Sequence, residues 1–255
     1  MTFILIFSFI LGSIVGSFLN VCIYRLPLKI SIITPPSNCP SCGRPIPFYE
    51  NTPILSYILL KGKCRGCNAP ISLQYPLIEF LTGLVALSLT LRFGLNLTTL
   101  FYFLFISALI VITFIDLKYQ IIPDVISLPG IGIGFLSSFF LPQITFLDSF
   151  LGIFIGGGSL LIVSTTYYLL TKREGMGFGD VKLLSMIGAF LGWKGALIGL
   201  ITGAFIGTLI GVLLMIKEKK DSKYPIPFGP FLSIGAILFI FFGREIIMAY
   251  LSLGR

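Results

Sequence analysis

Two aspartates occur where membrane-length apolar runs meet short polar loops. Asp180 ends the segment 174–180, whose sequence EGMGFGD places glycines at alternate positions before the carboxylate, and Asp116 ends another apolar run. Ionisable groups are rare within membrane segments and usually functional there. Two carboxyl groups in one low-dielectric site cannot both ionise, so one can activate a water while the other protonates a peptide carbonyl. We therefore predict that Asp116 and Asp180 form a proteolytic dyad.

The rest of the inventory is compatible with carboxylate chemistry. The chain of 255 residues contains no histidine, which excludes Ser-His-Asp and Cys-His catalysis and histidine-ligated zinc proteases. Two other classes of function stay open for the same residues. A transporter would use the aspartates for ion coupling. A scaffold protein whose loop is held by a metal, with no catalytic activity, would tolerate replacement of both aspartates.

The other acidic residues have simpler explanations. Glu79 lies just inside an apolar run, where a helix N-terminal charge and a role beside the cysteine-containing loop explain it equally well. Asp124 follows Pro123, as a first-turn carboxylate does. Glu174 lies in a loop with Lys172 and Arg173, which favours an ion pair. Solvated loops or the membrane interface account for the remaining ones: Glu50, Asp148, Glu218, Asp221 and Glu245.

Four cysteines form two CxxC pairs, Cys39 with Cys42 and Cys64 with Cys67, separated by 21 residues. Each pair can place two thiolates on one metal, and four thiolates complete a tetrahedral zinc site with no position left for water. Such a zinc would be structural. Two disulfides or a redox centre are the alternatives, and a reducing cytoplasm disfavours the disulfides. Cys22 lies in an apolar run and is expected to be a small buried residue.

Composition defines the fold class. Hydrophobic residues make up 56% of the chain and charged residues 11%, whereas soluble domains are about 25% charged. We predict an all-α polytopic membrane protein of about eight transmembrane helices with a small zinc-ribbon-like loop domain. The expected spans are 2–24, 77–91, 98–116, 124–141, 149–171, 181–193, 195–216 and 228–250. The expected domains are a first helix at 1–24, a tetracysteine domain at 25–76 and a transmembrane peptidase domain at 77–255.

The distribution of basic residues predicts the orientation. With Lys182 counted, 14 of the 18 lysines and arginines fall in or beside the loops 25–76, 117–123, 172–180 and 217–227. The positive-inside rule places these loops, and both aspartates, at the cytoplasmic face. The net charge of +8 therefore needs no nucleic-acid partner. Because no basic residue precedes the first span, we expect a retained helix rather than a cleaved signal.

Glycines recur at every fourth position from Gly195 to Gly211. Small residues at this spacing allow helices to approach closely. We expect a packing seam on this helix.

An ordered series of sequence blocks resembles one known family, the bacterial type IV prepilin peptidases. These are bifunctional leader peptidases and N-methyltransferases of the GxGD aspartyl protease class. Besides the two CxxC pairs, the blocks are GSFLN at 16–20, YRLP at 24–27, NTPILSY at 51–57, GKCR at 62–65, YPLIE at 75–79, and the segments 116–124 and 174–182. Archaeal preflagellin peptidases and presenilin-like proteases share the dyad but lack the cysteine-containing loop.

The resemblance implies specific roles and partners. Asp116 and Asp180 would be the catalytic pair, with Gly177 and Gly179 supporting the catalytic loop. The substrates would be prepilins and pseudopilins of type IV pili and type II secretion, cleaved after glycine at the cytoplasmic face of the bacterial inner membrane. The cysteine domain would be associated with S-adenosylmethionine-dependent methylation of the new N-terminus. No glycine-rich methyl-donor motif occurs, so the residues that bind this cofactor are not assigned.

Overall fold

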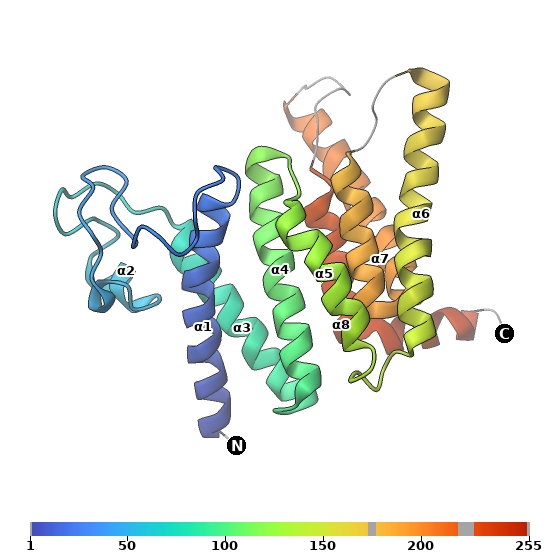
Figure 1. The fold of residues 1–255 in the computed structure, drawn as a ribbon, viewed down its shortest axis with the longest axis horizontal. Coiled ribbons are helices and arrows are strands. Elements are labelled where there is room, and N and C mark those ends of the chain that lie inside the picture. The colour runs from blue at the N-terminus through green and yellow to red at the C-terminus, as the bar shows by residue number, and fades with distance from the viewer. Residues whose placement is uncertain (1, 173–176, 219–226, 254–255) are drawn as a thin grey trace. The chain divides into compact units, whose positions relative to one another are not determined.

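The computed structural model describes residues 2–172, 177–218 and 227–253 (Figure 1). Every regular element within these ranges is a helix, and the cysteine loop adds only two isolated β-bridges. The elements are α1 Thr2–Arg25, the 3-10 helix η1 Phe48–Glu50, α2 Leu55–Leu59, α3 Gln74–Phe93, α4 Leu97–Tyr119, α5 Asp124–Ser137, α6 Phe146–Thr171, α7 Phe178–Glu218 and α8 Gly229–Leu253. This confirms the predicted all-α fold class.

The chain divides into two compact units. The N-terminal unit, Met1–Val111, contains α1, the cysteine loop, α3 and most of α4. The C-terminal unit, Ile112–Arg255, contains the end of α4 and the helices α5 to α8. Both predicted catalytic aspartates belong to the C-terminal unit, and all four paired cysteines belong to the N-terminal unit.

In the N-terminal unit, α1 and α3 pack through small residues. A Cβ atom on Gly12 would lie 2.6 Å from the Ala86 Cβ, and one on Gly83 would meet the Ser13 hydroxyl. The Thr90 hydroxyl donates a hydrogen bond of 3.0 Å to the Ser8 hydroxyl across this contact. Small residues and interhelical hydrogen bonds hold membrane helices together where lipid offers no hydrophobic driving force.

In the C-terminal unit, α6 and the start of α7 approach even more closely. Backbone meets backbone at Gly152 and Gly188, where a Cβ atom on either residue would overlap the other. The Ser149 hydroxyl donates a buried hydrogen bond of 2.7 Å to the Ala189 carbonyl in the same contact.

The chain reverses direction within α7, at Gly192. This glycine has a φ of 70° and a ψ of 178°, outside the helical range. A Cβ atom on Gly199 would lie 3.8 Å from the Ile187 Cγ2, although twelve residues span about 18 Å in a continuous helix. The element is therefore a helical hairpin, and its two arms correspond to the separate spans predicted at 181–193 and 195–216.

The second arm of this hairpin packs on α8 through its glycines. A Cβ atom on Gly203 would lie 3.2 Å from the Leu232 backbone nitrogen of α8. One on Gly207 would lie 3.0 Å from the Phe231 ring of the same helix. Both contacts lie on the predicted four-residue seam.

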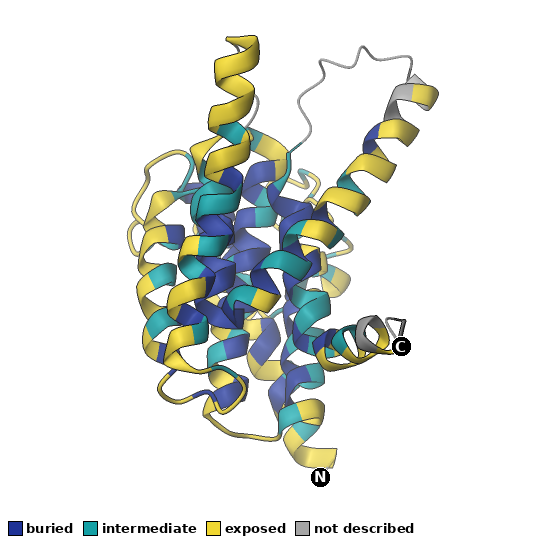
Figure 2. Ribbon diagram, turned by 90° about the vertical axis from the view of Figure 1, so that its right-hand side faces the viewer, coloured by how far each residue is buried: buried dark blue, intermediate teal, exposed yellow. Residues whose placement is uncertain are grey.

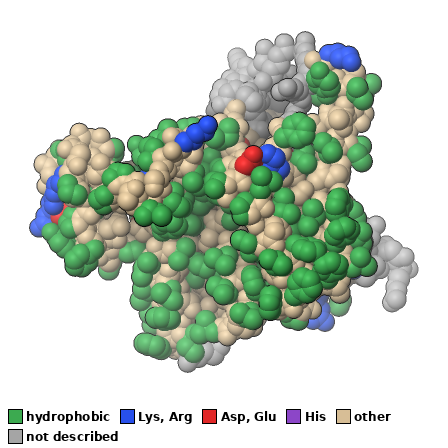
Figure 3. All heavy atoms as spheres, viewed as in Figure 1, with side chains coloured by type: hydrophobic (Ala, Val, Ile, Leu, Met, Phe, Trp, Pro, Cys, Tyr) green, Lys and Arg blue, Asp and Glu red, His purple; other side chains and the backbone are tan. Residues whose placement is uncertain are grey.

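Six described helices, with α7 counted once, are long and apolar enough to cross a membrane, and α5 is a shorter apolar helix. Buried residues line the inner faces of the helices, while exposed residues face outward (Figure 2). On the face that the space-filling view presents, hydrophobic side chains are widespread and charged ones are few (Figure 3). An apolar exterior is expected where lipid is the solvent, and the protein is a multi-pass membrane protein.

Candidate functional site

Asp116 lies in the last turns of α4 and is buried, with 5% of its surface exposed. Its Oδ2 atom accepts a hydrogen bond of 3.0 Å from the backbone N–H of Gly229, the first residue of α8. A helix N-terminus carries partial positive charge and unpaired N–H groups, so it favours an anionic partner. A Cβ atom on Gly229 would lie 2.7 Å from the same oxygen, so a larger residue here would displace this carboxyl group.

Asp180 lies in the first turn of α7, where its N–H donates to the Gly177 carbonyl at 3.2 Å. Ile122 links it to the Asp116 region. A Cβ atom on Gly179 would lie 2.9 Å from the Ile122 Cβ, and one on Gly229 would lie 3.5 Å from the Ile122 Cδ1. The carboxyl groups of Asp116 and Asp180 interact electrostatically. The structure thus brings the two predicted residues together at one end of the C-terminal unit.

The two glycines of the GxGD segment differ in their surroundings. Neither Gly177 nor Gly179 has a positive φ, so neither is required for backbone conformation. Gly179 is required for space, because Ile122 packs against it, whereas Gly177 is exposed and meets only the Gly179 nitrogen at 3.9 Å. The predicted ion pair of Glu174 lies outside the described residues.

Two features beside the dyad were not predicted. Gly229 belongs to the sequence FGP at 228–230. Its position directly before the last apolar run was the only sequence signal that could have indicated a role beside the dyad. Asp124 lies in the first turn of α5, as expected. Its Oδ1 atom also forms an ion pair with the Lys182 Nζ atom, at 2.7 Å. Both side chains of this pair are partly exposed, so it contributes about 1 kcal/mol or less.

The four loop cysteines meet at one point. Their sulfur atoms all lie within 4.8 Å of one another, and the Cys39 and Cys67 sulfurs are 3.9 Å apart. Tetrahedral thiolates around one zinc, with Zn–S bonds of about 2.3 Å, are separated by about 3.8 Å. A disulfide requires about 2.05 Å, so this geometry fits a shared metal and not two disulfides.

The two CxxC segments form matching knuckles. The Cys39 N–H donates to the Arg44 carbonyl at 2.9 Å, and the Cys64 N–H donates to the Ala69 carbonyl at 2.8 Å. Residues four positions after each first cysteine, Gly43 and Asn68, have positive φ values that turn the chain back. Backbone N–H groups of Cys42 and Ser41 lower the pKa of the Cys39 thiol to about 6, which favours its thiolate. The Ala69 N–H lowers the pKa of the Cys67 thiol, but burial and the neighbouring thiols outweigh it and raise that pKa to about 11.

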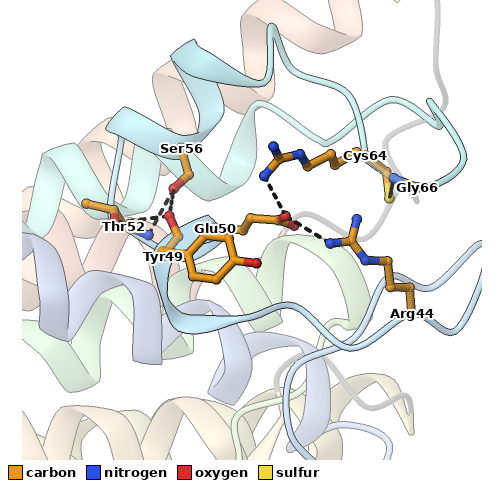
Figure 4. Close-up of polar contacts among 8 residues, drawn as sticks. Arg44, Tyr49, Glu50, Thr52, Ser56, Cys64 and Gly66 are labelled. Atoms are coloured by element: carbon orange, nitrogen blue, oxygen red, sulfur yellow. Dashed lines mark hydrogen bonds and ion pairs between the residues drawn. The ribbon is translucent and has the colours of Figure 1, made fainter.

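Glu50 joins the two knuckles, which corrects its assignment to a solvated loop. One carboxylate oxygen lies 2.9 Å from Arg44 and 3.2 Å from Arg65, each of which follows a cysteine of a different pair (Figure 4). The Glu50 side chain is only 9% exposed. Sequence separation hid this contact, because the two arginines become neighbours only when the cysteines meet.

Fold and site together define a polytopic helical membrane protein with paired aspartates at helix ends and a tetracysteine loop. A model of the bacterial peptidase A24 N-terminal domain matches residues 10–93, and a model of the type IV leader peptidase family matches residues 103–212. The chain belongs to the type IV leader peptidase family.

Relatives in this family match along nearly the whole chain. Proteins named prepilin leader peptidase/N-methyltransferase from Aeromonas hydrophila and Pseudomonas aeruginosa are 35% and 33% identical, and each alignment covers 96% of this chain and 92% of the relative. One of the same name from Myxococcus xanthus is 39% identical over 84% of this chain and 64% of its own length. No solved structure was found to match.

Proposed function

We propose that this protein removes the leader of type IV prepilins and pseudopilins and methylates the new N-terminus. The names of its relatives support both activities. The observation that carries the peptidase proposal is the convergence of Asp116 and Asp180 beside the N-terminus of α8. A chain without histidine needs another general base, and this pair supplies it.

The dyad performs hydrolysis through one shared proton. The ionised carboxylate takes a proton from water, and the resulting nucleophile attacks the carbonyl carbon of the glycine at the cleavage site. The protonated carboxyl group donates its proton to the carbonyl oxygen. When the tetrahedral intermediate collapses, the C–N bond breaks and the proton taken from water passes to the leaving nitrogen. Gly229 holds Asp116 through its N–H group, so that carboxyl group is fixed before substrate arrives.

The test is cleavage of a prepilin peptide by purified protein, followed by mass spectrometry. Asp116→Asn and Asp180→Asn preserve side-chain size but cannot transfer the proton, so each is expected to lower the rate at least about 1,000-fold, as for triad residues that act as a unit. Asp148→Asn is the matched control, because this carboxylate caps α6 within the same unit. Normal cleavage by either dyad variant would reject the proposal.

We also propose that the tetracysteine cluster binds one structural zinc through Cys39, Cys42, Cys64 and Cys67. The sulfur spacing supports this assignment. Four thiolates leave no open coordination position, so the metal stabilises the loop and takes no part in hydrolysis.

The proposed orientation places the dyad and the cysteine loop at the cytoplasmic face of the bacterial inner membrane, with prepilin and lipid as partners. The excess of lysine and arginine in the loops at that end supports this side. A basic leader would then remain in the cytoplasm while the apolar segment behind it enters the bilayer.

S-adenosylmethionine, when bound, supplies the methyl group for the second activity. We place methylation in the N-terminal unit, since the peptidase residues all belong to the C-terminal one. We propose residues 25–76 as the tetracysteine domain associated with this methylation.

A further inference from the structure

The N-terminal unit contains a cavity of about 490 Å³ beside the C-terminal half of α1. Its walls are one face of that helix, the segment 32–37 and the segment 48–53. Apolar side chains such as Phe18, Val21 and Phe48 form most of the lining, with hydroxyl and amide groups between them. Cofactor sites in proteins have this size, about 300–1,000 Å³, and this mixture of apolar walls with a few polar groups.

A buried cation lies at one end of the cavity. Arg25 lines it with only 7% of its surface exposed, and its guanidinium donates to the carbonyls of Ser31 and Pro36 at 2.9 and 3.4 Å. No described residue forms an ion pair with it. A buried charge is costly unless an opposite charge compensates it, and a guanidinium has five N–H donors, more than these carbonyls use.

A buried carboxyl group, that of Glu79, lies behind the wall of the cavity and not in its lining. Glu79, also 7% exposed, accepts a hydrogen bond of 2.7 Å from the Ile54 N–H, and Ile54 directly follows Pro53 in the lining. On the α1 side, a Cβ atom on Gly16, the residue before the lining residue Ser17, would lie 2.7 Å from the Glu79 Cα. It too forms no ion pair with any described residue. Ser17 and Arg25 are eight residues apart on α1, which corresponds to about 12 Å. On the same stretch, the buried Asn20 Oδ1 has no hydrogen-bond partner.

A ligand that compensates both charges must carry a carboxylate and a cation, with apolar surface between polar groups. We propose that the cavity is the methyl-donor site and binds S-adenosylmethionine, and this inference rests on the proposed methyltransferase activity. Arg25 binds the donor's carboxylate, and the part of the cavity beside Ser17, with the Glu79 charge behind it, faces the positively charged sulfonium. Phe18 and Phe48 provide apolar and aromatic surface for the adenosine.

The test compares binding of the donor with binding of its demethylated product, in which a neutral thioether replaces the sulfonium. Isothermal titration calorimetry of the full chain in detergent measures both affinities. Arg25→Gln removes the partner of a carboxylate that both ligands share, so it is expected to weaken both about 10- to 100-fold. Glu79→Gln is expected to weaken only the charged donor by a similar factor, leaving product affinity within about twofold.

Two further variants guard against indirect effects. Lys29→Gln removes an exposed cation from the turn after α1 and is expected to change neither affinity. Phe48→Ala, at a side chain that is 89% exposed, cannot disturb a core and is expected to weaken both ligands. Leader cleavage and bound metal, measured on the same preparations, show whether each variant remains folded.

The outcomes separate this inference from the proposed function. If the wild type cleaves leaders but neither binds the donor nor methylates, both the methyltransferase activity and this site are rejected. If it binds and methylates while Arg25→Gln, Glu79→Gln and Phe48→Ala all bind like the wild type, the site is wrong and the activity stands. Equal loss of both ligands in Glu79→Gln overturns its sulfonium role, and a tightly held phospholipid that the donor cannot displace assigns the cavity to lipid.

Discussion

The carboxyl groups of the proposed dyad are positioned by glycines that leave space for neighbouring atoms. Gly229 admits the Asp116 oxygen, and Gly179 admits Ile122 beside Asp180. Neither glycine has a positive φ, so the requirement is steric and not conformational. A larger side chain would displace the Asp116 carboxyl group at Gly229 and the Ile122 side chain at Gly179.

Gly229→Ala tests this steric role. The added methyl group would lie 2.7 Å from the Asp116 Oδ2, so it must displace that carboxyl group. A displacement of about 1 Å in a catalytic group costs about 100-fold in rate, and we expect a loss of that order in prepilin cleavage. Gly132→Ala is the control, because nothing lies within 4 Å of the added methyl group and full activity is expected. Equal rates for the two variants would show that Asp116 does not need this contact.

Sequence reasoning identified the acidic residues of the site but not their surroundings. Asp116 and Asp180 stood out because a carboxylate at a membrane boundary is costly and needs a reason. Gly229 did not, because glycines are frequent in apolar helices and the hydrogen bond joins residues 113 positions apart. The contacts of Glu50 escaped prediction for the same reason, since they form only after the two cysteine pairs meet.

The cysteine loop illustrates how an element can depend on a metal. Its described regular structure amounts to a single 3-10 turn, the short helix α2 and two isolated bridges, too little to form a core of its own. The knuckles and the bridging Glu50 are therefore expected to be ordered by the shared metal.

Metal removal should unfold this loop alone. After treatment with a strong zinc chelator, hydrogen exchange at the amides of Cys39 and Cys64 is expected to accelerate, because their hydrogen bonds close the knuckles. Amides in the α6–α7 contact, held by helix packing and the Ser149 hydrogen bond, serve as the internal reference and should keep their protection. Unchanged exchange at both cysteines in metal-free protein would contradict a structural metal.

At the scale of the whole molecule, the sequence predicted the number and order of helices well. Long apolar runs and the sign of the loop charges contain that information. Boundaries were less accurate: α5 ends at Ser137 although its apolar run continues to 141, and α3 begins at Gln74 rather than at 77. The reversal at Gly192 was predicted only as a break between spans, because its positive φ cannot be recognised among so many glycines.

The proposed topology predicts which positions face outward. Lys194 follows the reversal at Gly192, and Lys118 lies near Asp116, so the two lysines should lie on opposite sides of the membrane. In spheroplasts, a membrane-impermeant thiol reagent is expected to label Lys194→Cys but to leave Lys118→Cys and the native cysteines unlabelled. Labelling of Lys118→Cys from outside would reverse the orientation and remove the cytoplasmic site.

We propose that Asp116 and Asp180 act as one unit, and a double-mutant cycle on leader cleavage measures this coupling. Single-turnover rates are needed for the wild type, Asp116→Asn, Asp180→Asn and the double variant. If the two carboxyl groups share one proton, each single change removes the whole mechanism, and the double variant should be no slower than either single one. Losses that multiply in the double variant would show that the two residues act independently and would contradict the dyad.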